Sequence, residues 1–170
     1  MPTTTITTSR STRWLQAVRP ALARHAYAAV ALPLGLIALV VAPLGGARRV
    51  DRWQRALASR LLGMPADVPA SHRRGPTRRV LTHAVLSLPA NLVGFALVVP
   101  AWAVFLGRGV FYPAFGADHL EQSWGGPTLA GAWFAHFILG PPMLLVVTLL
   151  LGPVSRFQSR LALRYFATAG

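Results

Sequence analysis

Residues Leu81–Leu106, LTHAVLSLPANLVGFALVVPAWAVFL, decide the fold of this chain. Apart from His83, the stretch has no ionisable side chain. As an α-helix its 26 residues would rise about 39 Å, more than the roughly 30 Å hydrocarbon core of a bilayer. The stretch therefore predicts a helix that crosses a membrane.

A second apolar segment, residues 26–46, lies upstream and resembles this span. The dipeptide Leu-Pro occurs in both segments, at Leu32-Pro33 and at Leu88-Pro89. We interpret the upstream segment as a degenerate copy of the longer one. Because Pro33 and Pro43 each remove a backbone donor, the copy is expected to form either a kinked crossing or a re-entrant hairpin.

The composition is typical of a membrane protein rather than of a soluble domain. Hydrophobic residues make up 54% of the chain and charged residues 12%, which is too little charge to cover a surface that faces water. A third apolar segment, residues 128–151, is also long enough to cross a bilayer. We predict an all-α fold, namely a small polytopic helical membrane protein with two to three transmembrane helices plus two amphipathic juxtamembrane helices.

The two amphipathic helices are predicted at residues 48–62 and 154–166. In the first, Val50, Trp53 and Leu57 share one apolar face. Such a helix lies on an anionic membrane surface or packs against its own bundle, and its arginines favour the membrane surface. The candidate contacts with lipid headgroups in the two helices are Arg49, Arg52, Arg55, Arg60, Arg156, Arg160 and Arg164.

The positive charge of the chain comes entirely from arginine. There are 17 basic residues and four acids, which leave a net charge of +13. In a soluble protein this charge would indicate nucleic-acid binding. Here the arginines flank apolar segments, so we predict contact with anionic membrane lipids and no nucleic-acid partner.

The distribution of arginine predicts the orientation in the plasma membrane. Nine arginines lie in the basic loop 47–79, three follow residue 153, and one lies in the loop 107–127. The positive-inside rule then places the loop 107–127 outside the cell and the C-terminus in the cytoplasm. The side of the N-terminus depends on whether the segment 26–46 crosses.

We divide the chain into a tail, residues 1–24, and one membrane domain, residues 25–170. The tail is rich in Thr, Ser and Arg and is expected to be disordered or interfacial. A short helix that begins near Arg13 is expected to bend at Pro20, which has no backbone donor.

Several side chains are candidates for packing or sensing. Ser87, Asn91 and Gly94 share one helical face, which favours close helix packing, with a ligand pocket at Asn91 as the alternative. His136, inside the third span, is either a proton-sensitive switch or an inert hydrogen-bonded residue. The aromatic residues of the outward region suit a membrane interface; they are Trp102, Phe111, Tyr112, Phe115 and Trp124.

The sequence offers little for catalysis. The chain has no cysteine, which excludes disulfides, thiol catalysis and cysteine–zinc sites. Asp118, His119 and Glu121 lie together, but three adjacent polar residues at a loop tip are interpreted as solvated rather than as a metal site. We expect no enzymatic activity, no cofactor and no catalytic, cofactor-binding or metal-binding residue.

Several short motifs are similar to those of a known family. They are Tyr27–Leu36 (YAAVALPLGL), the helix end Arg60-Leu61-Leu62-Gly63, the Leu-Pro span, Trp102, Phe111-Tyr112-Pro113, and the last apolar span with Gly152-Pro153. Over roughly residues 24 to 166 the chain resembles the sensor domain found at the N-terminus of many actinobacterial histidine kinases, and sometimes alone. The resemblance implies two hairpins of membrane helices with both tails in the cytoplasm, joined by a basic amphipathic helix.

The chain departs from that family in two ways. After Val41 the family continues into another apolar helix, whereas here Gly45-Gly46-Ala47 leads directly to Arg48-Arg49. We therefore expect the first hairpin to lack its return limb. Neither a phosphoacceptor helix nor ATP-binding glycine boxes follow within the chain, which implies a stand-alone or truncated copy.

The resemblance implies a non-enzymatic sensor or signal-input module that feeds a two-component-type histidine kinase or another cytoplasmic regulator. A small membrane scaffold or transporter subunit is the alternative function. The sequence leaves a homodimer open.

Overall fold

The computed structural model describes residues 10–64, 75–115 and 117–166, and this part of the chain is helical almost throughout, with no strand. The prediction of an all-α fold is confirmed. In chain order the elements are α1 (Arg10–Val41), η1 (Ala42–Gly46), α2 (Ala47–Leu62), α3 (Pro76–Val104), η2 (Phe105–Val110), α4 (Tyr112–Phe115), η3 (Ala117–Gln122) and α5 (Leu129–Phe166).

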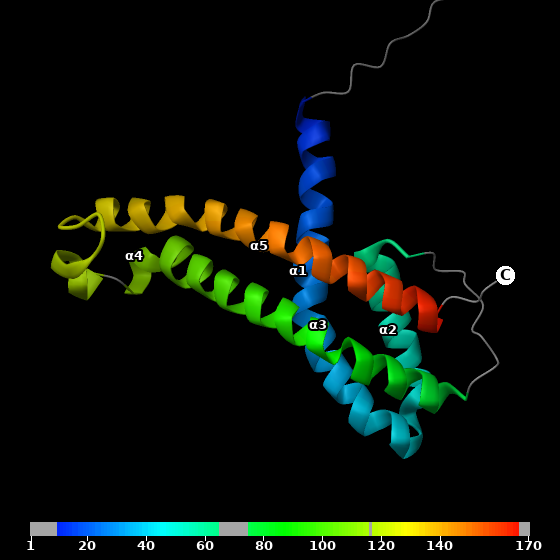
Figure 1. Ribbon diagram of the computed structural model, residues 1–170. Coiled ribbons are helices and arrows are strands. Elements are labelled where there is room, and N and C mark those ends of the chain that lie inside the picture. Colours follow the sequence, from blue (N-terminus) through cyan, green and yellow to red (C-terminus); the bar gives the residue numbers. More distant parts are fainter. Residues whose placement is uncertain (1–9, 65–74, 116, 167–170) are drawn as a thin grey trace, which may run out of the picture.

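Helices α3 and α5 form an antiparallel hairpin, which α1 crosses near its middle (Figure 1). The short elements α4 and η3 connect the two helices at one end of the hairpin. Three helical stretches are long and apolar enough to cross a membrane, namely Val18–Leu62, Pro76–Val110 and Leu129–Phe166. The predicted polytopic helical membrane protein is therefore confirmed.

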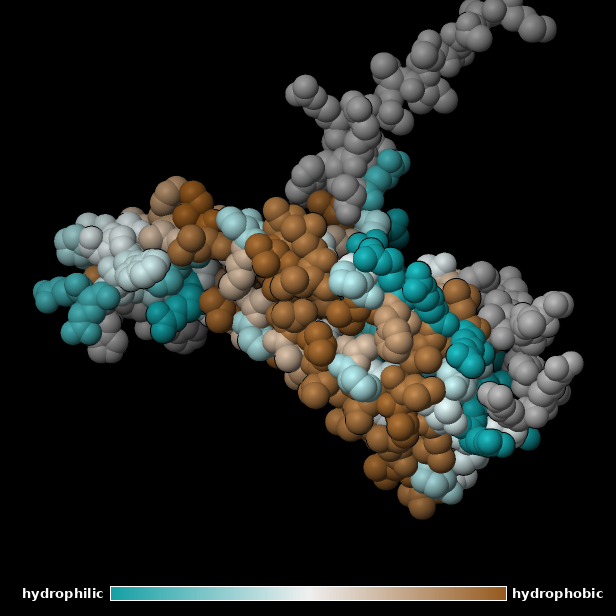
Figure 2. All heavy atoms as spheres, in the orientation of Figure 1, coloured by the Kyte–Doolittle hydropathy of each residue, from teal (hydrophilic) through white to brown (hydrophobic). Residues whose placement is uncertain are grey.

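The exposed surface explains why the chain needs a membrane. Leucine, valine and isoleucine side chains of all three long stretches are exposed; among them are Val40, Leu44, Leu92, Leu145 and Leu149. Together they form a broad hydrophobic band between hydrophilic residues at the two ends of the hairpin (Figure 2). A contiguous apolar surface of this extent requires lipid around it, so the chain is a multi-pass membrane protein.

The first hairpin does have a return limb, which corrects the prediction that it was lost. The chain reverses at Gly45, whose φ of +91° is in the left-handed region that favours glycine. Helix α2 then runs back along α1, so that Ala38 of α1 and Ala42 of η1 pack with Ala47 and Val50 of α2. The basic amphipathic helix is therefore itself the return limb.

The predicted bend at Pro20 is wrong, because α1 is one helix from Arg10 to Val41 with Pro20 and Pro33 inside it. Proline removes a single backbone donor, and the neighbouring residues in QAVRPALARHAY are mostly strong helix formers. Part of the expected tail is thus helical, and residues 1–9 lie outside the described residues.

Helix α2 packs against α1, α3 and α5, which is the alternative that the sequence left open. Its buried side includes Val50 and Ala58 but also Asp51 and Gln54, whereas Trp53 is 41% exposed. The buried face of α2 is therefore rotated relative to the predicted apolar face, because Asp51 points inward to its polar partner on α3.

Candidate functional site

A cleft lies where α1, α2 and α5 meet. It has a volume of about 820 Å³, and five arginines line it. Arg19 and Arg24 come from α1, Arg60 from the last turn of α2, and Arg156 and Arg160 from successive turns of α5. Residues from three separate parts of the sequence thus place their charges around one space.

The helix ends explain this arrangement. Helix α2 ends at Leu62, and Gly63, which has a φ of +68°, lets the chain leave the helix just after the turn that contains Arg60. The sequence predicted Arg60, Arg156 and Arg160 as headgroup contacts but missed Arg19 and Arg24. The sequence predicts that Arg19 and Arg24 belong to a tail outside the membrane domain. Their place at the cleft follows only from the continuation of α1 through Pro20.

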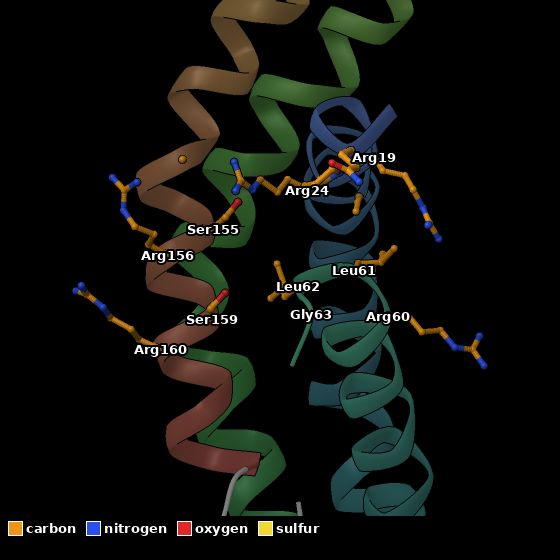
Figure 3. Close-up of a pocket in the computed structure, with 14 residues that line it drawn as sticks. Arg19, Arg24, Arg60, Leu61, Leu62, Gly63, Ser155, Arg156, Ser159 and Arg160 are labelled. Atoms are coloured by element: carbon orange, nitrogen blue, oxygen red, sulfur yellow. The ribbon is translucent and has the colours of Figure 1, made fainter. Parts of the chain in front are cut away.

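Arg24 differs from the other arginines of the cleft. Its side chain reaches across from α1 toward Ser155 on α5, whereas Arg19, Arg60, Arg156 and Arg160 point outward around the rim (Figure 3). Ser155 is buried, and all five arginines are exposed. The cleft therefore has a cationic rim and one guanidinium within it.

No described carboxylate neutralises this charge. Asp51 pairs elsewhere, because its Oδ1 accepts a hydrogen bond from Arg79 Nη2 at 2.8 Å and its Oδ2 accepts one from Arg55. Glu121 belongs to η3, at the loop end of the α3–α5 hairpin. The five arginines consequently make no ion pair with the acids that the structure describes.

A polar junction lies in the interior of the helix bundle. Asn91 Nδ2 donates to the carbonyl of Ala31 on α1 at 3.3 Å and to Ser87 Oγ at 3.2 Å. Its Oδ1 accepts a hydrogen bond from Gln158 Nε2 on α5 at 2.9 Å. Gly94 permits a close approach, since a Cβ there would lie 3.2 Å from Ala28 Cβ. The face formed by Ser87, Asn91 and Gly94 thus contacts both neighbouring helices.

The junction contains a small cavity of about 10 Å³ beside Asn91. Gln54 Oε1, His83 Nδ1 and Gln158 Oε1 are buried nearby in the junction without a hydrogen-bond partner among the described residues. The volume is about that of one water molecule, and the ligand pocket at Asn91 stays a prediction. The sequence does not predict the buried positions of Gln54 and Gln158. Each lies in a helix whose many arginines predict contact with the membrane surface.

Trp102 belongs to the contact between the helices rather than to the loop. Its Nε1 donates to His25 Nδ1 at 2.9 Å, and His25 Nε2 lies 3.0 Å from Thr148 Oγ1. Because an indole nitrogen can only donate, His25 must accept at Nδ1 and donate from Nε2. This chain of hydrogen bonds joins α3, α1 and α5.

His136 lies at the loop end of α5. Its ring stacks on Tyr112 with centroids 4.8 Å apart, and its Nδ1 lies 2.8 Å from the carbonyl oxygen of Ala132. Tyr112 also hydrogen-bonds to Ser123, and Trp133 Nε1 donates to the carbonyl of Gly109 at 2.7 Å. The loop is thereby attached directly to the first turns of α5.

The remaining predicted aromatic residues of the loop differ in exposure. Phe111 is 53% exposed and Trp124 is 76% exposed, as suits side chains at a membrane interface. The side chains of Phe115, Asp118 and His119 lie outside the described residues.

Comparison with protein-family models, with curated proteins and with solved structures finds no match to the chain. The resemblance to the sensor domain of histidine kinases therefore stays a prediction.

Proposed function

We propose that the protein is a non-enzymatic membrane input module, in which α5 carries a change at the loop 107–127 to the basic end of the bundle. The observation that supports this proposal is the continuity of α5. It extends from Leu129 beside the loop to Phe166 beyond the last arginine, 38 residues in one helix, or about 57 Å. Pro141, Pro142 and Pro153 lie inside α5 without ending it, so one continuous helix connects the loop with the basic end.

The contacts at each end of α5 favour the same function. At the loop end, the stacking of Tyr112 on His136 and the hydrogen bond from Trp133 to Gly109 couple the loop to the helix. At the other end, Arg156 and Arg160 border the cleft, and Arg164 is exposed beyond it. The proposed receiver is a cytoplasmic regulator such as a histidine kinase on another polypeptide.

The proposed orientation has the loop outside the cell and the cleft at the cytoplasmic side. Arg19, Arg60 and Arg156 border one cleft, so the N-terminal part of α1, the end of α2 and the basic part of α5 belong to one side of the molecule. In the loop 107–127 there is a single arginine, Arg108. This asymmetry fits the positive-inside rule.

Two fluorescent labels test the proposed coupling. A dye is attached to a Leu163→Cys variant at the basic end, in protein reconstituted into nanodiscs, and the loop is cut at a protease site inserted after Asp118. Cutting is expected to change the emission of the dye. A dye on Leu149→Cys, which is 68% exposed in the middle of α5, is the control and should respond less. An unchanged signal at residue 163 after complete cleavage contradicts the proposal.

A further inference from the structure

The cleft is bordered by five arginines from three helices, and no acid that the structure describes pairs with them. An anion bound among these cations would be attracted by all of them. We propose that the cleft binds the phosphate group of an anionic lipid headgroup, and that this lipid connects α1, α2 and α5. The inference goes beyond signalling and holds whether or not a partner is present.

The polar lining suits a phosphate. A guanidinium presents its donors as a planar fork that matches phosphate oxygens, and several such groups bind one phosphate from different sides. Arg24 already lies across the cleft near Ser155, whose hydroxyl is a further donor (Figure 3). The outward arginines on the rim need only a change of rotamer to reach a ligand inside.

The apolar lining indicates that the phosphate belongs to a lipid rather than to the solution. Pro20, Leu61 and Leu62 line the cleft together with the arginines. A volume of about 820 Å³ also falls in the range typical of pockets for organic ligands and far exceeds the needs of one phosphate ion.

The surface of α5 offers a path for the acyl chains. Leu145, Leu149, Gly152 and Arg156 follow one another at spacings of four, three and four, so they share one helical face. Leu145 is 60% exposed and Leu149 is 68% exposed, whereas Gly152 and Arg156 line the cleft. The lipid-facing surface of the helix thus continues directly into the arginine-lined space, as an amphiphilic ligand requires.

The proposal is tested by lipid titration of the detergent-solubilised full chain, read by native mass spectrometry. Phosphatidylglycerol is the probe, phosphatidylcholine is the zwitterionic comparison, and glycerophosphoglycerol supplies the same phosphodiester without acyl chains. We expect one phosphatidylglycerol to bind at least about tenfold more tightly than either comparison, because it alone has both a net negative charge and acyl chains. Glycerophosphoglycerol that binds equally well would overturn the assignment to a lipid.

Matched variants locate the site. The double variant Arg24→Gln, Arg156→Gln is expected to weaken binding of phosphatidylglycerol about tenfold or more, with its helical circular dichroism unchanged because both side chains are exposed. Arg164→Gln, on the same helix and outside the cleft, is the control and should bind as the wild type does. Equal losses in the double variant and in the control would show that the lipid responds to net charge, and the proposed site would be wrong.

Discussion

The side-chain amide of Asn91 makes hydrogen bonds within α3 and to both α1 and α5. It donates to α1, accepts from α5 and also bonds within α3. In lipid the apolar surroundings give little drive for helices to associate, so interhelical hydrogen bonds and close packing contribute much of their stability. Exchange of Asn91 therefore tests how strongly the junction holds the bundle.

The variant Asn91→Leu is expected to lower the free energy of unfolding by about 2 kcal/mol, since three hydrogen bonds of about 0.6 kcal/mol each are lost. Unfolding in detergent by increasing SDS, followed by circular dichroism, measures the change. Leu92→Ala is the control, because Leu92 is 57% exposed on the lipid-facing side of the same helix. Equal stability of Asn91→Leu and the wild type would contradict a structural role for the junction.

Two arginines that share Asp51 offer a second comparison. The side chain of Arg79 on α3 is 7% exposed, whereas that of Arg55 on α2 is 31% exposed. Loss of a partner from a buried ion pair typically costs about 3–5 kcal/mol, and loss of an exposed one about 0–1 kcal/mol.

We therefore expect Arg79→Gln to destabilise the protein strongly and Arg55→Gln to destabilise it weakly in the same SDS unfolding measurement. If the two variants lost equal stability, the buried contact between α2 and α3 would not be what anchors α2.

Among the elements, the connection between α1 and α2 requires a positive φ at one residue. Gly45 has a φ of +91°, and a β-branched side chain is strained there even though no atom lies within 4 Å of the position of its Cβ.

Gly45→Val is expected to cost about 1–3 kcal/mol and to loosen the return of α2, which would appear as faster proteolysis within residues 47–62. Gly107→Ala has similar open space without the positive φ and should leave both stability and proteolysis unchanged. A Gly45→Val protein as resistant as the wild type would show that the turn tolerates another conformation.

The sequence predicts the elements better than it predicts their contacts. The spans of α3 and α5 follow from apolar length, because the thickness of the hydrocarbon core sets that length. The packing of α2 could not be predicted, since Asp51 and Gln54 count as solvent-facing in any hydropathy pattern and become buried only when α2 packs against α1, α3 and α5. Arg24 was missed for a related reason, because its place in the cleft depends on α1 continuing through Pro20.

The arrangement of the molecule in the bilayer can be measured with introduced cysteines, because the chain has none of its own. A membrane-impermeant maleimide applied to intact cells is expected to label Ala117→Cys, and to label Leu163→Cys only after permeabilisation.

Gln16→Cys should behave like Leu163→Cys, because Gln16 and Ser159 border the same cleft. Labelling of Gln16→Cys from outside would place the N-terminal part of α1 on the opposite side and contradict the proposed orientation.

The position of Gln158 in the last helix has a consequence for biogenesis. Asn91 enters the membrane with α3, but its partner on α5 is synthesised 67 residues later, and Phe166, which packs against His83, comes later still. Until then Asn91 Oδ1 lacks its partner Gln158, and a polar group exposed in lipid can bind other membrane proteins. We therefore expect a chain truncated before α5 to be degraded faster in the cell than the full chain.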